Sequence, residues 1–426
     1  MIDAVIEMKR FDQSSLLDQM AIAGTLTPDL MTETARMIAH FHRGASIDPT
    51  RGGAANLAGV LDINKAGFST SHVFDESAVE AFDKSFRTAL ARHAALLDSR
   101  EKAGKVRRCH GDLHLRNICL LGGKPRLFDC IEFNDQIAIV DVLYDLAFLL
   151  MDLWHRGFPE LANLVMNRYL DEADDDDGFV LLPFFMAVRA AVRAHVTATQ
   201  VEEASSASKD LVAEAKSYFE LARNLLHIPA ARIIAIGGLS GSGKTTIAEA
   251  LAAYVGAPPG ARIVESDRIR KALHGVPPET RLPEKAYRPE ISDRVYREMA
   301  RRTGLILAQS GSVVADAVFE RREDRERIGN EAANCGTPML GIWLEADPTV
   351  LRRRVNERRG GPSDATVDIL SRQLQRNTKG TTWHRLEAAR KPAHIVADIL
   401  HLTGADALQR KPDRVRSSYS SQIEGG

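Results

Sequence analysis

A glycine-rich segment in the second half of the chain carries the strongest chemical signal. Residues 238–245 read Gly-Leu-Ser-Gly-Ser-Gly-Lys-Thr; they follow an apolar run, Arg232 to Ile236, and precede a helical pattern that ends near Val255. In this context the G-x-x-x-x-G-K-[ST] spacing predicts a phosphate-binding loop, because glycines let backbone N–H groups curl around phosphate oxygens at the positive end of a helix. A glycine-rich turn without ligand is the alternative.

We therefore predict ATP and Mg²⁺ as cofactors. Lys244 would reach the β and γ phosphates, and the Thr245 hydroxyl would ligate the metal. The predicted nucleotide contacts are Gly238, Ser240, Gly241, Ser242, Gly243, Lys244, Thr245 and Thr246.

Two carboxylates follow predicted strands of the same region. Asp267 comes just after the strand 261–264, which we place beside the P-loop strand, and it would accept a proton from an acceptor hydroxyl. Arg270, one helical turn later, would bind the acceptor. Asp316 ends the strand 312–315 and would hold the magnesium. Helix capping explains Asp267 and Asp316 as well, so both interpretations stay open.

An arginine-rich segment at 352–359 follows the predicted strand Met339 to Leu344 and precedes the pair Gly360-Gly361. Arg354 and Arg358 lie four residues apart and so share one helical face. This arrangement is typical of a mobile lid that brings arginines over the phosphates. A solvated surface helix is the alternative.

The first half holds a second constellation. His110, Asp112 and Asn117 have the H-x-D-x-x-x-x-N spacing of a kinase catalytic loop, and Asp129 follows downstream. Asp112 would be the proton acceptor, and Asn117 and Asp129 would be Mg²⁺ ligands.

A predicted hairpin brings these ligands together. Gly122-Gly123 reads as a two-residue turn between the apolar runs 118–121 and 124–128. Pairing outward from the turn places Asn117 opposite Phe128, next to Asp129. Asp141 and Asp145 would brace the loop rather than react.

The elements that position these residues indicate an α/β protein with two domains. Residues 1–226 read as mostly helical, with a strand at Ala4 to Met8, helical patterns at 14–42 and 76–100, and a long loop with short helical pieces at 43–70. The acidic run 171–178 is interpreted as a solvated loop rather than a metal site. After a break at 227–230, strands alternate with helices, which predicts a parallel sheet with helices on both faces over 230–410. Residues 411–426 are expected to be a flexible tail.

Composition argues against several classes of protein. The net charge of −1 and pI near 6.9 argue against a dedicated nucleic-acid binder. The four cysteines lack the spacing of a zinc site or disulfide framework and read as reduced thiols. Without a signal-peptide pattern or a long uninterrupted apolar stretch, we expect a cytoplasmic protein with no membrane partner.

The second half resembles a known group of enzymes. GLSGSGKTT, the ESDxxRK segment, VVADAVF and the LRRRVxxRRGxPSDA segment are similar to small P-loop kinases grouped with polynucleotide kinase, gluconate kinase and chloramphenicol phosphotransferases. The resemblance implies that Asp267 is the base or an acceptor contact and that Arg354 and Arg358 grip ATP.

The first half resembles the aminoglycoside phosphotransferase family through its HGDxHxxN-like loop. The order of the domains resembles proteins described as bifunctional aminoglycoside phosphotransferase and ATP-binding proteins. This implies a kinase-like fold for 1–226, in which we expect most of the small lobe to be missing, either because the sequence begins late or because the lobe is a remnant. No glycine-rich loop lies upstream of His110, and the strand Ala4 to Met8 offers only Glu7 or Lys9 where the phosphate-pairing lysine belongs.

These observations favour an ATP-dependent kinase of a small-molecule hydroxyl, with the chemistry in the P-loop domain. An ATP-hydrolysing regulatory protein is an alternative. A polynucleotide end kinase is another, with phosphate contacts from the arginines at 352–359 and from Arg262, Arg268 and Arg270. The first half could be catalytic, a noncatalytic substrate or regulatory platform, or purely structural. The sequence names neither the acceptor nor an oligomeric state.

Overall fold

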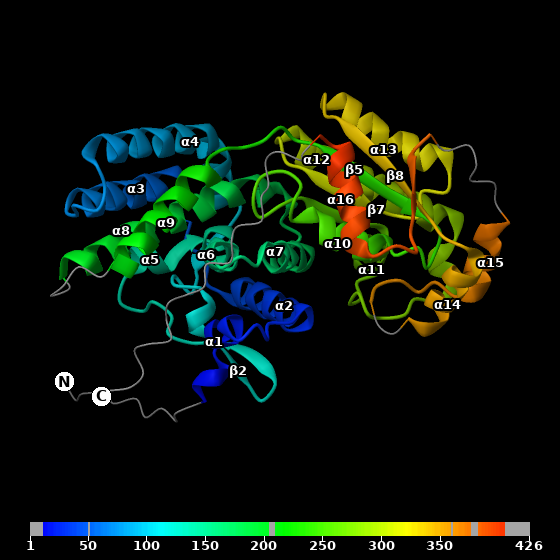
Figure 1. The fold of residues 1–426 in the computed structure, drawn as a ribbon, viewed down its shortest axis with the longest axis horizontal. Coiled ribbons are helices and arrows are strands. Elements are labelled where there is room, and N and C mark those ends of the chain that lie inside the picture. Colours follow the sequence, from blue (N-terminus) through cyan, green and yellow to red (C-terminus); the bar gives the residue numbers. More distant parts are fainter. Residues whose placement is uncertain (1–11, 50–51, 204–208, 359–360, 376–381, 405–426) are drawn as a thin grey trace. The chain divides into compact units, whose positions relative to one another are not determined.

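Helices and strands fall into two units of different secondary structure (Figure 1). The computed structural model describes residues 12–49, 52–203, 209–358, 361–375 and 382–404. Within these ranges the first unit comprises residues 12–156 and 185–222, and the second comprises 157–184 and 223–404. The predicted strand Ala4 to Met8, with Glu7 and Lys9, and the tail 411–426 lie outside the described residues.

The first unit is mostly helical, with two small antiparallel sheets, β1–β4 and β2–β3. Helices α8 and α9 each cross the boundary between the units at one end. Its elements are α1 (Leu17–Ile22), α2 (Pro28–Gly44), α3 (Gly53–Ser69), α4 (Glu76–Lys102), β1 (Val106–Arg108), β2 (Ile118–Leu121), β3 (Lys124–Leu127), α5 (Asp135–Ala138), β4 (Ile139–Asp141), α6 (Val142–His155), α8 (Leu182–Glu203) and α9 (Lys209–Leu225), with 3₁₀ turns η1 (Gln13–Ser15) and η2 (Leu115–Asn117).

Two expectations for this unit need correction. The helical pattern at 14–42 is broken: α1 ends before a turn, and α2 restarts where the Thr27 side chain caps the Leu30 N–H at 3.2 Å. The segment 43–70 holds one long helix rather than a long loop with short helical pieces, because 53–69 form α3. Because this segment contains several glycines and polar residues, its helical pattern was not recognised. Leu57, Leu61 and Phe68 form the buried face of the helix.

The predicted hairpin is confirmed. Ile118 pairs with Leu127, and the Phe128 N–H donates to the Asn117 carbonyl at 3.2 Å, so Asn117 lies opposite Phe128 as the turn requires. Gly122 and Gly123 both have positive φ, 59° and 75°, the backbone of a type I′ turn.

The second unit is built on a five-stranded parallel sheet in the order β6-β7-β5-β8-β9. Its elements are α7 (Pro159–Ala173), η3 (Asp176–Leu181), β5 (Ile233–Gly238), α10 (Lys244–Ala252), β6 (Arg262–Glu265), α11 (Ser266–Leu273), η4 (Glu284–Tyr287), α12 (Pro289–Ala308), β7 (Val313–Asp316), α13 (Arg322–Asn334), β8 (Met339–Glu345), α14 (Pro348–Glu357), α15 (Val367–Leu374), β9 (His384–Glu387) and α16 (Pro392–Leu402).

Both faces of the sheet are covered, as expected. Ile234 and Ile236 of β5 pack with residues of α10 and α16 on one face. The alternate residues Ile233 and Ala235 are also fully buried, and α12 contacts β6 and β7. A central parallel strand buried on both faces explains why 233–236 is continuously apolar.

Two features of the sheet differ from the expectation. β6 does not lie beside the P-loop strand, because β7 pairs with β5 and separates the two. Strand β9 was not expected, because its residues, His384 to Glu387, are mostly exposed and carry no apolar pattern.

The acidic run is also not a solvated loop. Asp175 and Asp176 are buried, and Asp176 and Asp171 pair with the guanidinium of Arg262. Repulsion among the acidic side chains is offset by arginines that are distant in the sequence, which a local charge count does not reveal.

Among the described residues, one helical stretch, 176–202, is long and apolar enough by composition to cross a membrane. Because 78% of its most apolar window is buried inside the protein, it has the character of a core helix and is weak evidence for a membrane span.

Candidate phosphoryl-transfer site

The loop between β5 and α10 has the backbone of a phosphate cradle. Gly238, Gly241 and Gly243 have φ values of 144°, 85° and 84°, which side chains rarely allow. A Cβ on Gly241 would also lie 2.7 Å from the Leu351 carbonyl oxygen, so glycine is required there for close packing as well. Lys244 begins α10, so the helix points its N-terminus at the loop.

Thr245 and Asp316 meet at the end of this loop. The Thr245 hydroxyl donates to Asp316 Oδ2 at 2.7 Å, which joins the first turn of α10 to the end of β7. Hydroxyl and carboxylate oxygens are the ligands that Mg²⁺ prefers, so this pair fits the predicted metal site. Burial raises the pKa of Asp316 to about 6, against the opposing effects of Lys244 and the Thr245 hydrogen bond.

Lys244 is the centre of a group of charges. Its ammonium donates to the Leu239 carbonyl at 3.3 Å. Burial lowers the pKa of Lys244, Asp316 and Asp267 oppose that shift, and the positive charge of Arg358 adds to it. The predicted base, metal ligand and lid arginine therefore all lie within electrostatic reach of the P-loop lysine.

The predicted lid packs against the loop. Leu351, Val355 and Leu370 form a small core on which Leu239 of the P-loop packs. Arg354 Nη1 lies 4.0 Å from the position that a Cβ on Gly243 would occupy. Arg354 thus approaches the phosphate cradle from α14, and Arg358 follows directly after that helix.

Gln373 of α15 was missed by the sequence reasoning. Its Oε1 accepts the Ser240 N–H at 3.0 Å, so it holds one of the backbone donors of the P-loop. No sequence motif identifies it, because Gln373 lies far from the P-loop in the sequence. The helix that carries it begins six residues after Gly361.

Glu265 was missed too. It is the last residue of β6 and only 4% exposed. Burial, with Asp316 and Asp267 nearby, raises the pKa of Glu265 to about 8, and Arg268 opposes this shift. The sequence feature that could have identified Glu265 is a carboxylate at the end of an apolar strand, two residues before Asp267.

Arg270 lies on the same helix as Asp267. It is 6% exposed, its Nη1 donates to the Ala286 carbonyl at 2.8 Å, and its guanidinium carbon lies 4.7 Å from the centre of the Tyr287 ring. Its Nε has no hydrogen-bond partner among the described residues.

A further contact joins the end of the lid to this region. Asp364 Oδ2 accepts from Lys271 Nζ and from the Tyr287 hydroxyl, both at 2.6 Å, and from the Leu282 N–H at 2.9 Å. These bonds lower the pKa of Asp364 against the opposing effect of its burial. The segment after the lid arginines is thereby anchored beside Arg270.

The catalytic loop of the first unit is also organised. Asn117 Nδ2 donates to the carbonyl and to Oδ2 of Asp112, both at 2.9 Å, and His114 Nε2 lies 3.3 Å from that carboxylate. Burial acts to raise the pKa of Asp112, but His114, Arg189 and Asn117 lower it to about 2. Asp129 is exposed and has a φ of 59°. The roles of Asn117 and Asp129 as metal ligands stay predictions.

Asp145 holds this loop in place. Its oxygens accept the N–H groups of His110 at 3.2 Å and Gly111 at 2.8 Å, and His42 Nε2 lies 3.0 Å from Oδ2. His42, Asp145 and Cys109 have ligand atoms close enough for a metal ion, but the Asp145 oxygens are already used by the backbone. Asp141 likewise pairs with Arg100, at 2.7 and 2.9 Å. The expected bracing role of Asp145 agrees with its contacts, whereas Asp141 contacts Arg100 and the Leu143 N–H, both outside the loop, and its bracing role stays a prediction.

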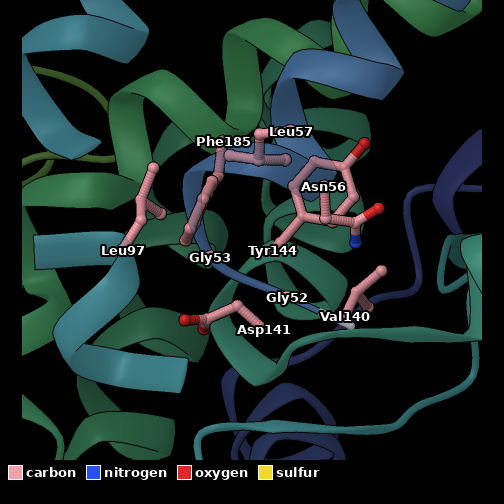
Figure 2. A pocket seen from close by; sticks show the side chains of 9 residues that line it. All are labelled: Gly52, Gly53, Asn56, Leu57, Leu97, Val140, Asp141, Tyr144 and Phe185. Carbon is pink, nitrogen blue, oxygen red and sulfur yellow. The ribbon is translucent and has the colours of Figure 1, made fainter. Parts of the chain in front are cut away.

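Figure 2 shows a pocket in the first unit that Asp112 does not line. It lies over Gly52 and Gly53 and is lined mainly by Leu57, Leu97, Val140, Tyr144 and Phe185. Its one carboxylate, Asp141, is engaged by Arg100. The pocket therefore offers little chemistry for binding a phosphoryl donor.

Together, the parallel sheet, the P-loop and the charges around Lys244 define a P-loop kinase domain, and the helical unit carries a phosphotransferase-like loop. Comparison with known proteins agrees. A family model described as "Phosphotransferase enzyme family" matches residues 9–179, and one described as "AAA domain" matches residues 233–379.

Relatives share either both parts or the second alone. The uncharacterized protein Rv2004c of Mycobacterium tuberculosis (strain ATCC 25618 / H37Rv) is 27% identical over 94% of this chain and 81% of its own length. A shikimate kinase of Nitrobacter winogradskyi is 32% identical over 40% of this chain and 68% of its own length. A gluconokinase structure from Sinorhizobium meliloti 1021 is 23% identical, covers 42% of this chain and 94% of that one, and has a TM-score of 0.29.

The chain thus combines an N-terminal region that matches the phosphotransferase enzyme family with a C-terminal P-loop kinase domain, and it is similar to Rv2004c over most of its length.

Proposed function

We propose that the P-loop domain transfers the γ-phosphoryl group of ATP to a hydroxyl of a small molecule. The observation that carries the proposal is the geometry at the P-loop, where the Thr245 hydroxyl donates to Asp316 at 2.7 Å and Arg354 Nη1 lies 4.0 Å from the position of a Cβ on Gly243. Binding of nucleotide needs the loop and its metal, whereas phosphoryl transfer also uses a group that takes the proton of the nucleophile and an arginine that stabilises the transferred group.

Each group has a part in this reaction. Lys244 and the loop N–H groups hold the β and γ phosphates, and Thr245 and Asp316 hold Mg²⁺, which when bound screens the charge of the phosphates. Asp267 accepts the proton of the acceptor hydroxyl. Arg354 and Arg358 stabilise the charge that develops on the transferred group.

Arg270 favours an acceptor that carries an anionic group. A buried guanidinium with an unpaired N–H is costly, and a carboxylate or phosphate on the acceptor would satisfy it. Arg270 also follows Asp267 by one turn of α11, so the anion and the reacting hydroxyl would lie side by side. The related shikimate kinase supports this choice, since shikimate is a hydroxylated carboxylate.

Label transfer from γ-labelled ATP tests the proposal on the full chain. Hydroxy acids and their neutral parent alcohols are offered as matched pairs, together with nucleosides and oligonucleotide ends. We expect label on a hydroxy acid, and a rise of about 10- to 100-fold in acceptor KM for Arg270→Gln with ATP binding unchanged. Arg281→Gln, at an exposed position, is the control. Label on none of the acceptors, or Mg²⁺-dependent release of phosphate alone, would contradict the proposal.

The first unit is proposed to be a noncatalytic platform that binds the acceptor or regulates the kinase. Asp112 and Asn117 are arranged for chemistry, but among residues 12–49 and 52–109 the structure has helices and one short strand, β1, rather than a small lobe that could cover ATP.

A further inference from the structure

Residues 157–184 belong to the P-loop unit although their neighbours in the chain on both sides belong to the other unit. They form α7 and η3, and Figure 1 shows α7 beside α10, with which it is in contact. The family match to the phosphotransferases includes most of this segment.

Helix α7 takes the place of a neighbouring strand at the edge of the sheet. β6 is an edge strand, whose outer backbone groups need partners. Asn163 Nδ2 donates to the Pro259 and Ala261 carbonyls, both at 3.0 Å. Asn167, one helical turn on, accepts the Ile263 N–H at 2.7 Å.

The acidic run then fixes this helix through charge. Arg262 of β6 is 2% exposed, and it donates from Nε to Asp176 at 2.7 Å and from Nη2 to Asp171 at 2.6 Å. On α12, Arg302 donates to Asp174 at 2.8 Å and to Asp176 at 3.2 Å. Buried charges are tolerated only when they are paired, so the contacts of Arg262 select one position of the segment.

Residues of α7 also form ion pairs with the helices α10 and α11, which follow the strands β5 and β6. Asp171 Oδ2 lies 3.5 Å from Arg268 Nη1, and Arg268 Nε donates to Glu265 Oε2 at 2.9 Å. Arg268 is the residue after Asp267 on α11. Arg168 of α7 pairs with Glu249 of α10, the helix that begins at Lys244.

We propose that residues 157–184 are an integral part of the P-loop kinase, in which Asp171 is a positioning residue that holds Arg268 against Glu265 and thereby sets the orientation of α11 and Asp267. The catalytic part of this statement rests on the proposed function. The structural part, that α7 holds β6 and α11, stands independently of it.

Arg268 lies between two carboxylates, Asp171 and Glu265, and this position explains the role of Asp171. Glu265 is buried next to Asp316 and Asp267, and Arg268, together with Arg168, supplies the positive charge that compensates it. Asp171 orients that cation from the side of α7. Without the Asp171 charge, Arg268 and the first turn of α11 lose one of their two anchors, and a shift of about 1 Å at Asp267 can cost about 100-fold in rate.

The test compares Asp171→Asn with Asp174→Asn in the full chain. Both changes remove one charge from the same segment without changing its size, but Asp174 is 77% exposed and, among the described residues, forms an ion pair only with Arg302. The readouts are hydrogen exchange of the backbone at 262–273, the affinity for ATP, and kcat for ATP turnover. Arg268→Lys, which keeps the charge and loses the second N–H contact, is the second variant.

We expect Asp171→Asn and Arg268→Lys to speed exchange at 262–273 by about 10-fold or more. Both should lower kcat by about 10- to 100-fold with ATP affinity within about twofold of wild type. Asp174→Asn should change none of these. Exchange in both variants equal to that of Asp174→Asn would overturn the proposal. If the wild type turns over no ATP, the proposed function fails, and the exchange comparison still decides whether α7 holds α11.

Discussion

The Thr245 hydroxyl donates a 2.7 Å hydrogen bond to Asp316 Oδ2. This bond joins the first turn after the P-loop to the end of the neighbouring strand β7, so one change tests both halves of the proposed metal site. Thr245→Val keeps the shape of the side chain and removes its oxygen. We expect the Mg²⁺ concentration for half-maximal turnover to rise by about 10- to 100-fold. Thr280→Val, at an exposed position, should leave it unchanged.

Asp316 should make magnesium binding depend on pH. Its pKa is raised to about 6, so the protonated form persists to a higher pH than for an exposed aspartate. The metal needs the ionised form; binding should therefore weaken by about tenfold for each pH unit below 6 and level off above it. Titrating Mg²⁺ into the ATP-bound protein from pH 5 to 8 measures this. Asp316→Asn removes the contribution of this group, and an identical pH profile in that variant would refute the assignment.

The lid arginines should act on the rate more than on nucleotide affinity. Arg354 approaches Gly243, and Arg358 affects the charge state of Lys244, so both lie where charge develops during transfer. Arg354→Gln and Arg358→Gln should each lower kcat by about 10- to 1,000-fold, with a smaller change in the affinity for ATP. Arg353→Gln, at an exposed position on α14, serves as the control. Equal effects in all three variants would indicate a general loss of surface charge instead.

His195 should make the first unit sensitive to acid. Burial lowers its pKa from 6.5 to about 4, and its Nε2 has no hydrogen-bond partner among the described residues. A folded-state pKa below the unfolded value means that this group's contribution to stability is complete above pH 6.5 and is lost as pH falls toward 4. At pH 5 the loss is about 2 kcal/mol.

Urea unfolding at pH 7.5 and pH 5 measures this loss. His195→Phe keeps the edge-to-face contact with Phe68 and should reduce the difference between the two pH values. His40→Phe, at an exposed position, should not. If His195→Phe loses as much stability at pH 5 as the wild type does, another group carries the acid sensitivity.

The P-loop and the hairpin were predictable because both depend on neighbours in sequence. Gly122 and Gly123 determine their own turn, and the turn determines that Asn117 lies opposite Phe128. The strand order was not predictable in this way. Local patterns place Asp267 after a strand, but which strand lies beside β5 is decided by packing across the whole sheet.

Residues that act through distant partners were the ones missed. Gln373 contacts Ser240 from 133 positions away, and Asp176 of the acidic run is buried where it pairs with Arg262. Taken alone, a glutamine on a helix or a run of aspartates looks like surface. The partners that give these residues a structural role, Ser240 and Arg262, are brought next to them only by the fold.

The comparison of Lys244→Ala with Asp112→Asn tests the central claim most directly. Both variants are made in the full chain and assayed for transfer of label from γ-labelled ATP to the acceptor. Chemistry in the P-loop domain predicts that Lys244→Ala loses transfer by about 1,000-fold or more, whereas Asp112→Asn stays within a few fold of wild type. Transfer that survives Lys244→Ala and is lost in Asp112→Asn would place the reaction in the first unit and contradict the account.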